Sequence, residues 1–177
     1  MTNHTETTPR IYVACLAAYN NGILHGRWID ADQGVDHIWN EVKAMLEASP
    51  IEEVAEEWAI HDYEGFEGIA LSEWQDFESV AQYAELIEEH GPIIAELITH
   101  FGGSVDDAET AINDCYHGEW DSITEYAEQF AEDCGYLAEV PEHLAHYIDF
   151  EAFGRDLMMG DFYSIEIDHK HHIFSHH

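Results

Sequence analysis

The chain has 177 residues, with 38 Asp or Glu against five Lys or Arg, and its formal net charge is −33. This charge excludes nucleic acid and anionic membranes as direct partners, because both would be repelled, and it favours a basic partner surface. The composition excludes disorder, because 46% of the residues are hydrophobic, 12% are aromatic and only four are proline.

The chain is predicted to begin with a frayed arm (1–9) followed by two strands. RIYVACLAAY (10–19) is apolar and aromatic, which is typical of a buried strand. NNG (20–22) is a turn signal, so ILHGRWID (23–30) is predicted to be the returning strand.

A helix and a further strand complete the predicted N-terminal α+β domain, residues 1–65. Apolar residues recur at helical spacing ahead of Pro50. They are Ile38, Val42, Met45 and Leu46. EEWAIHDYEGF (56–66) alternates between apolar and polar residues and predicts a strand.

The middle of the chain, residues 66–103, is predicted to be a helical domain. One apolar stripe runs along the first helix, 76–90. Its members are Phe77, Val80, Ala81, Ala84 and Ile87. Gly91 can end this helix and Pro92 suits the first turn of the next, which stops at the glycine pair 102–103. The second helix carries its own apolar residues, Ile94, Leu97, Ile98 and Phe101.

The remaining residues, 104–177, are predicted to be a second α+β domain. Ser104 resembles an N-cap with Asp107 three residues later, which indicates the start of a helix. CYHGEW (115–120) is predicted to be a strand, and 122–134 a helix ending at Gly135.

The C-terminal part continues in the same mixed pattern. Pro141 is predicted to start a short helix, Asp149 to cap another, and DFYSIEID (161–168) to form a period-2 strand. The fold class is therefore α+β, with a helical middle between mixed ends.

Three observations indicate a cytoplasmic protein. No stretch approaches the ~20 apolar residues that span a bilayer. The N-terminal sequence MTNHTETTPR lacks the apolar core of a signal peptide. Cys15, Cys115 and Cys134 are an odd set without C-x-x-C spacing, which favours reduced thiols.

The charge is distributed without neutralisation. Residues 44–154 contain 29 acids and no Lys or Arg. In the predicted helix 76–90, Glu78, Glu85 and Glu89 share the face opposite the apolar stripe. Like charges one turn apart cost a few tenths of a kcal/mol each. Mixed charges would serve solubility equally well, so this excess indicates another purpose.

Three explanations fit the excess of acids. Halophilic adaptation and divalent-metal binding both give acidic, Lys-poor surfaces. The third is imitation of a polyanion, because B-DNA carries one charge per about 1.7 Å and 33 charges at that density match roughly 56 Å of duplex. Residue composition leaves all three open.

Metal ligation has two weak local signals. DADQGVDHIWNE (30–41) matches four acidic positions of a calcium loop, but the required Gly is displaced to Gly34, which indicates a chance match. Histidines also gather near the C-terminus, and a solvated tail is the preferred interpretation of the segment 169–177. The acids of the loop match are Asp30, Asp32, Asp36 and Glu41; the histidines are His143, His146, His169, His171, His172, His176 and His177.

Catalysis is not expected. The chain has no G-x-S-x-G, no P-loop and no G-x-G-x-x-G. Nothing among the 38 carboxylates singles out an acid–base pair. We therefore expect a binding protein rather than an enzyme.

Several segments resemble the ArdA family of antirestriction proteins. RIYVACLAAYNNGILHGRWIDA (10–31) and EEWAIHDYEGF (56–66) are similar to its N-terminal part, and YLAEVPEHLAHYIDFEAFGRDL (136–157) to its antirestriction motif. The resemblance implies three small domains in an elongated chain, a curved homodimer, and carboxylates that imitate bent DNA. It also implies binding in the DNA groove of type I restriction–modification enzymes, without catalysis or cofactor.

The resemblance and the charge together predict a distributed binding surface in which no single residue dominates. The candidate DNA-mimic carboxylates are Glu47, Glu52, Glu53, Glu56, Glu57, Glu78, Glu85, Glu88, Glu89, Glu96, Asp106, Asp107, Glu109, Asp114, Glu119, Asp121, Glu125, Glu128, Glu132 and Asp133. The candidates in the antirestriction-motif segment are Glu139, Pro141, Glu142, Tyr147, Asp149, Glu151, Arg155 and Asp156.

Other residues of the last domain are predicted to serve packing or self-association. Arg155 and Lys170 lie where the resemblance places dimer contacts. The apolar residues of the motif are expected to pack a core or a subunit contact. They are Tyr147, Ile148, Phe150, Phe153 and Leu157.

Overall fold

The computed structural model describes residues 7–51 and 54–176, and within them it contains eight helices and six strands in two small sheets. With 45% helix and 21% strand, the α+β class is confirmed. The chain divides into two compact units, unit 1 (Met1–Thr99) and unit 2 (His100–His177). The finer division into three domains at residues 65 and 103 remains a prediction.

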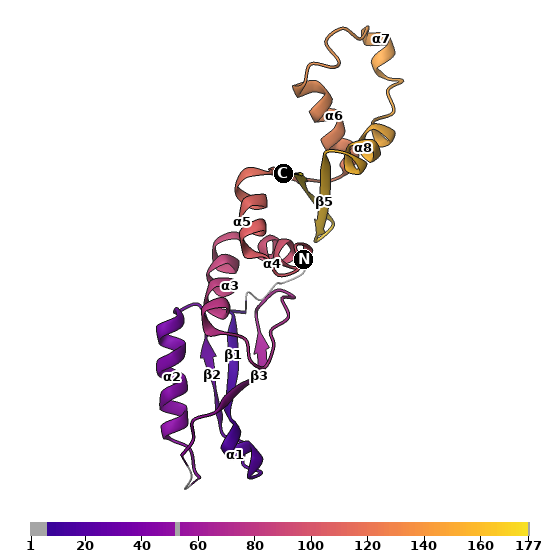
Figure 1. The fold of residues 1–177 in the computed structure, drawn as a ribbon. Helices are drawn as coiled ribbons and strands as arrows, with labels where there is room; N and C mark the ends of the chain where they lie inside the picture. The colour runs from indigo at the N-terminus through magenta and orange to yellow at the C-terminus, as the bar shows by residue number, and fades with distance from the viewer. Residues whose placement is uncertain (1–6, 52–53, 177) are drawn as a thin grey trace. The chain divides into compact units, whose positions relative to one another are not determined.

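Unit 1 is built on an antiparallel sheet in the order β2-β1-β3 (Figure 1). Its strands are β1 (Arg10–Cys15), β2 (Gly26–Asp30) and β3 (Trp58–Glu64). Ile11 of β1 pairs with Ile29, and Val13 pairs with Ile60. All four side chains are buried, so one face of the sheet forms part of the core.

The prediction of a single strand over 10–19 is wrong at its end. Residues Leu16–Asn20 form the short helix α1, and the N–H of Asn21 donates to the Ala18 carbonyl at 3.0 Å. The alanines of this segment favour helix over strand. The return strand starts at Gly26, where a Cβ would lie 2.6 Å from the Val13 carbonyl oxygen, so the close pairing requires glycine.

Three longer helices complete unit 1 and confirm the predicted periodicities: α2 (Val35–Glu47), α3 (Phe77–His90) and α4 (Pro92–His100). The ring of Phe77 lies 4.2 Å from that of Trp58 and 4.7 Å from that of Trp39, measured between centroids. These rings join α2, α3 and the sheet in one core.

Unit 2 contains the second antiparallel sheet, in the order β4-β6-β5. Its strands are β4 (Tyr116–Trp120), β5 (Phe162–Ile167) and β6 (Lys170–Ser175). Its helices are α5 (Val105–Asp114), α6 (Ile123–Asp133), α7 (Glu142–Ala145) and α8 (Phe150–Met159).

Helices α6 and α8 lie side by side next to β5 (Figure 1). A Cβ at Gly154 would lie 2.9 Å from the Ile123 side chain, so glycine lets the two helices approach closely. Tyr126, Phe162 and Ile173 form the buried cluster on which they pack.

The prediction that residues 169–177 form a solvated tail is wrong. Residues Lys170–Ser175 form β6, the central strand of the sheet, and Ile173 and Phe174 are 0% exposed. A two-residue turn at Asp168 and His169, both with positive φ, returns the chain from β5 into β6. The ladder hydrogen bonds and the two apolar side chains outweigh the polarity of the neighbouring histidines.

Candidate acidic binding surface

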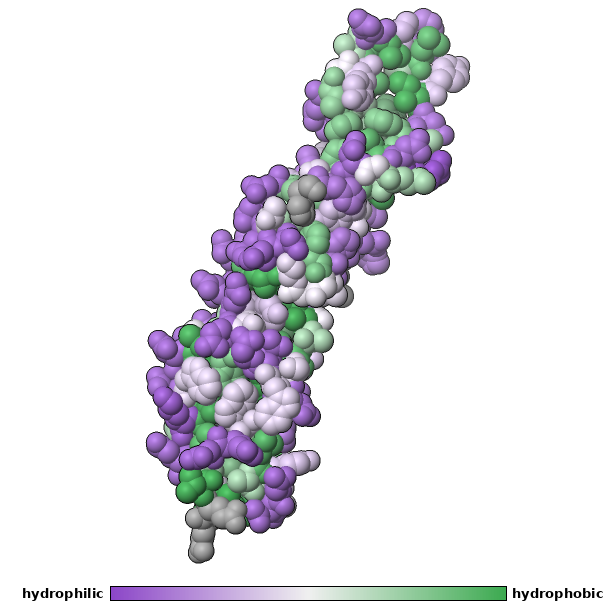
Figure 2. All heavy atoms as spheres, viewed as in Figure 1, coloured by the Kyte–Doolittle hydropathy of each residue, from purple (hydrophilic) through white to green (hydrophobic). Residues whose placement is uncertain are grey.

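The predicted DNA-mimic carboxylates lie at the protein surface. Glu52 and Glu53 are outside the described residues, which leaves 18 of the 20 candidates; 17 of these are exposed and Glu109 is half-buried. Figure 2 shows hydrophilic residues, in purple, spread over the drawn face of both units. The 18 described candidates thus lie at or near the surface, whereas their binding role remains a prediction.

Helix α3 carries one row of these carboxylates in unit 1. Val80, Ala84 and Ile87 are buried, and their spacing turns one side of the helix toward the core. Glu85 and Glu88 are exposed on the remaining surface, as are Glu78 and Glu89. The amphipathic pattern thus fixes where these acids project.

Helix α6 carries the corresponding row in unit 2. Tyr126, Ala127 and Ala131 are buried on one face of the helix, and its acids are exposed on the remaining surface. These acids are Glu125, Glu128, Glu132 and Asp133. Glu125 has a local task as well: its side chain accepts from the N–H of Asp121 at 3.1 Å, and its own N–H donates to Ser122 Oγ at 3.1 Å.

Few cations neutralise these rows. Arg10 Nε donates to Glu64 Oε1 at 2.5 Å, and Arg27 Nη1 donates to Glu41 Oε2 at 2.7 Å. Neither acid is one of the candidates. Lys170 binds Asp121, and this hydrogen bond raises the lysine pKa. Among the described residues, Asp121 is the one candidate carboxylate bonded to a Lys or Arg.

Histidines approach two further candidates. The His90 ring lies 3.9 Å from Glu89, and His172 Nε2 lies 3.8 Å from Glu119. Burial lowers the pKa of His172, and Glu119 opposes that shift. His172 Nδ1 also lies 2.8 Å from the Tyr116 hydroxyl, so its ring is held on both sides.

The antirestriction-motif segment is more exposed than an apolar core segment would be. All eight of its candidate residues are exposed. Asp149 caps α8, because its Oδ1 accepts from the Ala152 N–H at 2.9 Å, as predicted. Leu157 packs on the buried cluster of unit 2, but Tyr147 is 83% exposed and does not pack in the core of this chain.

Exposed apolar side chains were not foreseen from the sequence. Tyr136, Leu144 and Met159 of unit 2 are 61%, 48% and 77% exposed, and Leu24 and Val54 of unit 1 are 77% and 80% exposed. Their apolar character predicts burial, and no local pattern distinguishes them from core residues.

The described residues do not form a group suited to a metal ion. Within residues 7–51 and 54–176, no group of three or more His, Cys, Asp or Glu side chains could hold a metal ion. Burial raises the pKa values of Tyr126 and Tyr163 to about 12, so both stay protonated near neutral pH. In the same part of the chain, no helix is long and apolar enough to cross a membrane.

Comparison with known proteins identifies a family for the chain. A family model described as antirestriction protein (ArdA) matches residues 11–170, from β1 to the first residue of β6. The match covers well over half of the 177 residues. A search of curated proteins finds no match.

Proposed function

The chain belongs to the ArdA family of antirestriction proteins, and we propose that it inhibits type I restriction–modification enzymes by mimicking B-form DNA. The exposed carboxylates would take the place of phosphates in the DNA-binding groove of the methyltransferase core. Restriction is blocked because the groove is occupied, and modification is blocked to the extent that it uses the same groove.

One observation carries this proposal. Of the 18 described candidate carboxylates, 17 are exposed, and Asp121 is the one bonded to a Lys or Arg in the described residues. Ordinary surfaces intersperse both signs of charge. An acidic surface without its own cations leaves its carboxylates available to the cations of a partner.

The driving force is the one that governs DNA binding. A groove lined with Lys and Arg releases counterions when it exchanges duplex for carboxylates, so affinity falls steeply with salt. Association is fast at low salt because the long-range field steers the encounter. The shape of the acidic rows then selects the partner, since charge alone selects none.

Self-association is part of the same proposal. Tyr147, Tyr136 and Met159 are exposed apolar side chains of unit 2, and their burial in a homodimer would stabilise it. A dimer would double the charged length presented to the enzyme. We further propose that the protein acts in the cytoplasm, without cofactor or catalysis, where restriction enzymes meet incoming DNA.

The direct test is displacement of a fluorescent duplex from a type I methyltransferase core at moderate salt. Stoichiometric displacement that weakens as salt is added supports mimicry. A polyglutamate of matched net charge is the control and should displace much less, because it lacks the shape. No displacement at several-fold excess would overturn the proposal and leave halophilic adaptation or metal binding as explanations of the charge.

A further inference from the structure

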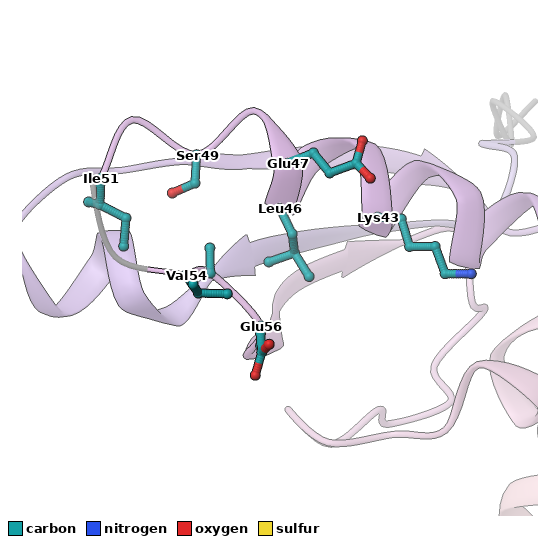
Figure 3. A pocket seen from close by; sticks show the side chains of 8 residues that line it. Lys43, Leu46, Glu47, Ser49, Ile51, Val54 and Glu56 are labelled. Carbon is teal, nitrogen blue, oxygen red and sulfur yellow. The ribbon is translucent and has the colours of Figure 1, made fainter.

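A hollow lined by both apolar and polar side chains lies beside the C-terminal end of α2 in unit 1 (Figure 3). Its volume is about 470 Å³. Leu46, Ile51, Val54 and Ala55 supply its apolar lining. Figure 3 shows Leu46 between the side chains of Glu47 and Glu56, with Val54 to one side of Leu46. Ser49 and Lys43 complete the lining.

The hollow is unusual for its position on a highly charged surface. Val54 is 80% exposed, and Leu46 and Ile51 are half-buried. Exposure of these apolar side chains to water is unfavourable. Covering the valine with a partner would stabilise the complex by about 25 cal/mol for each Å² of apolar surface removed from water. Exposed apolar side chains flanked by charged ones are typical of an interaction site.

The charges around the hollow select its occupant. Glu47 and Glu56 line the hollow and are exposed, against Lys43 as the one cation among the described residues that line it. A second copy of this chain has five Lys or Arg among its 177 residues and so offers few cations to meet these acids. A basic surface that carries an apolar side chain between Lys or Arg residues would complement both parts of the hollow. Its apolar side chain would contact Leu46 and Val54, and its cations would pair with Glu47 and Glu56.

We propose that the hollow is an anchor site for one apolar side chain of the basic DNA-binding groove that the protein occupies. Lys or Arg residues beside that side chain meet Glu47 and Glu56. The inference rests on the proposed function and extends it: this contact is one that a row of phosphates does not offer. The complex therefore gains a salt-independent part of its affinity.

The test compares Val54→Ser with the unaltered chain, using the dissociation constant for a type I methyltransferase core over a series of salt concentrations. Loss of the valine methyl groups should weaken binding by about fivefold at every salt concentration. The slope of the logarithm of the constant against the logarithm of salt should stay unchanged, because no charge is altered.

Two matched variants define the control measurements. Leu24→Ser removes an apolar side chain that is 77% exposed in the same unit but does not line the hollow, and should bind normally. Glu47→Gln with Glu56→Gln should reduce the salt slope by about two. Thermal melting of each variant checks that it is folded.

The outcomes separate this inference from the proposed function. If the unaltered chain binds the core and Val54→Ser binds equally well, or changes the slope alone, the anchor is overturned and mimicry stands. If Val54→Ser changes the oligomeric state in sedimentation instead, the hollow belongs to a second copy and the assignment is wrong. If the unaltered chain fails to bind, both proposals fall.

Discussion

Units 1 and 2 carry nearly the same net charge on very different cores. Unit 1 has 20 acids and three Lys or Arg (−17), and unit 2 has 18 acids and two (−16). In the described residues, 24 buried hydrophobic residues belong to unit 1 and nine to unit 2. Charge density and core size are thus set independently in this protein.

The difference in core size indicates which unit is destabilised more by repulsion between its acids. Repulsion between like charges destabilises any compact state, and apolar burial must offset it. Unit 1 has a large aliphatic core on α2, α3 and the first sheet. Unit 2 depends on a small set of rings and alanines. We therefore expect unit 2 to be the less stable of the two.

The largest expected effect comes from equal truncations of the two cores. Phe77→Ala and Phe174→Ala each remove a ring that is 0% exposed, at a cost of about 3–5 kcal/mol. Unit 2 should unfold in Phe174→Ala, whereas unit 1 should remain folded in Phe77→Ala. The measurement is a two-dimensional NMR spectrum of the tryptophan indoles, because Trp120 reports on unit 2 and the other four on unit 1.

A truncation at the surface provides the control for this comparison. Tyr136→Ala removes a side chain that is 61% exposed and should leave all five indole signals in place. The opposite result would have two parts: Phe77→Ala would lose the indole signals of unit 1, and Phe174→Ala would keep the Trp120 signal. That result would reverse the expected order of stability.

The next prediction tests whether the acids of both units contribute to the affinity for the enzyme core. Glu85, Glu88 and Glu89 of α3 are changed to Gln in one variant. Glu128 and Glu132 to Gln, with Asp133 to Asn, form the matched variant in α6. Each should weaken binding to the enzyme core by about tenfold and reduce the salt slope by as much as about three. A loss confined to one variant would restrict the mimic surface to one unit.

Salt should stabilise unit 2 more than unit 1. Raising the salt concentration from about 0.05 M to 0.5 M shortens the Debye length and screens repulsion between exposed carboxylates. The melting temperature should rise by about 3–6 °C in unit 2 and less in unit 1. Melting followed by the indole signals separates the units, and a larger rise in unit 1 would contradict the role given to core size.

Helix caps are expected to have similar, smaller effects in both units. Asp76 Oδ1 accepts from the Ser79 N–H at 2.7 Å, and Asp149 caps α8 in the same way. Asp76→Ala and Asp149→Ala should each cost about 1 kcal/mol of unfolding free energy in urea titrations. Gln82→Ala, at an exposed position of α3, is the control. Equal stability of all variants would show that the caps are dispensable.

The smallest effect is a pH dependence of unit 2. Burial lowers the pKa of His172 below its usual 6.5, so the folded state favours the neutral ring. Its contribution to stability is present above pH 6.5 and is lost as the pH falls through the folded-state pKa. The measurement is the urea midpoint of unit 2 between about pH 7.5 and 5.5.

Substitution of two histidines identifies the source of that dependence. His172→Gln should show a smaller decrease in stability on acidification than the unaltered chain. His169→Gln is the control, because the His169 side chain is 100% exposed. An unchanged pH dependence in His172→Gln would assign the effect to other groups.

Local patterns were enough to predict most of the secondary structure. The stripe of α3 and the caps Ser104 and Asp149 depend on residues within one or two helical turns of each other, which the sequence places together. The surface position of the acids follows from the same periodicity. The net charge is a property of composition alone.

Other features depend on residues that are distant in sequence. The histidine-rich segment is the central strand because β4 and β5 pair on its two sides, and Asp121 is neutralised because β6 carries Lys170 to it across 49 positions. The sequence by itself determined the elements and the charge, because these arise within a few residues. The tertiary structure decided which acids are neutralised and which apolar side chains stay exposed, because both depend on which distant segments meet.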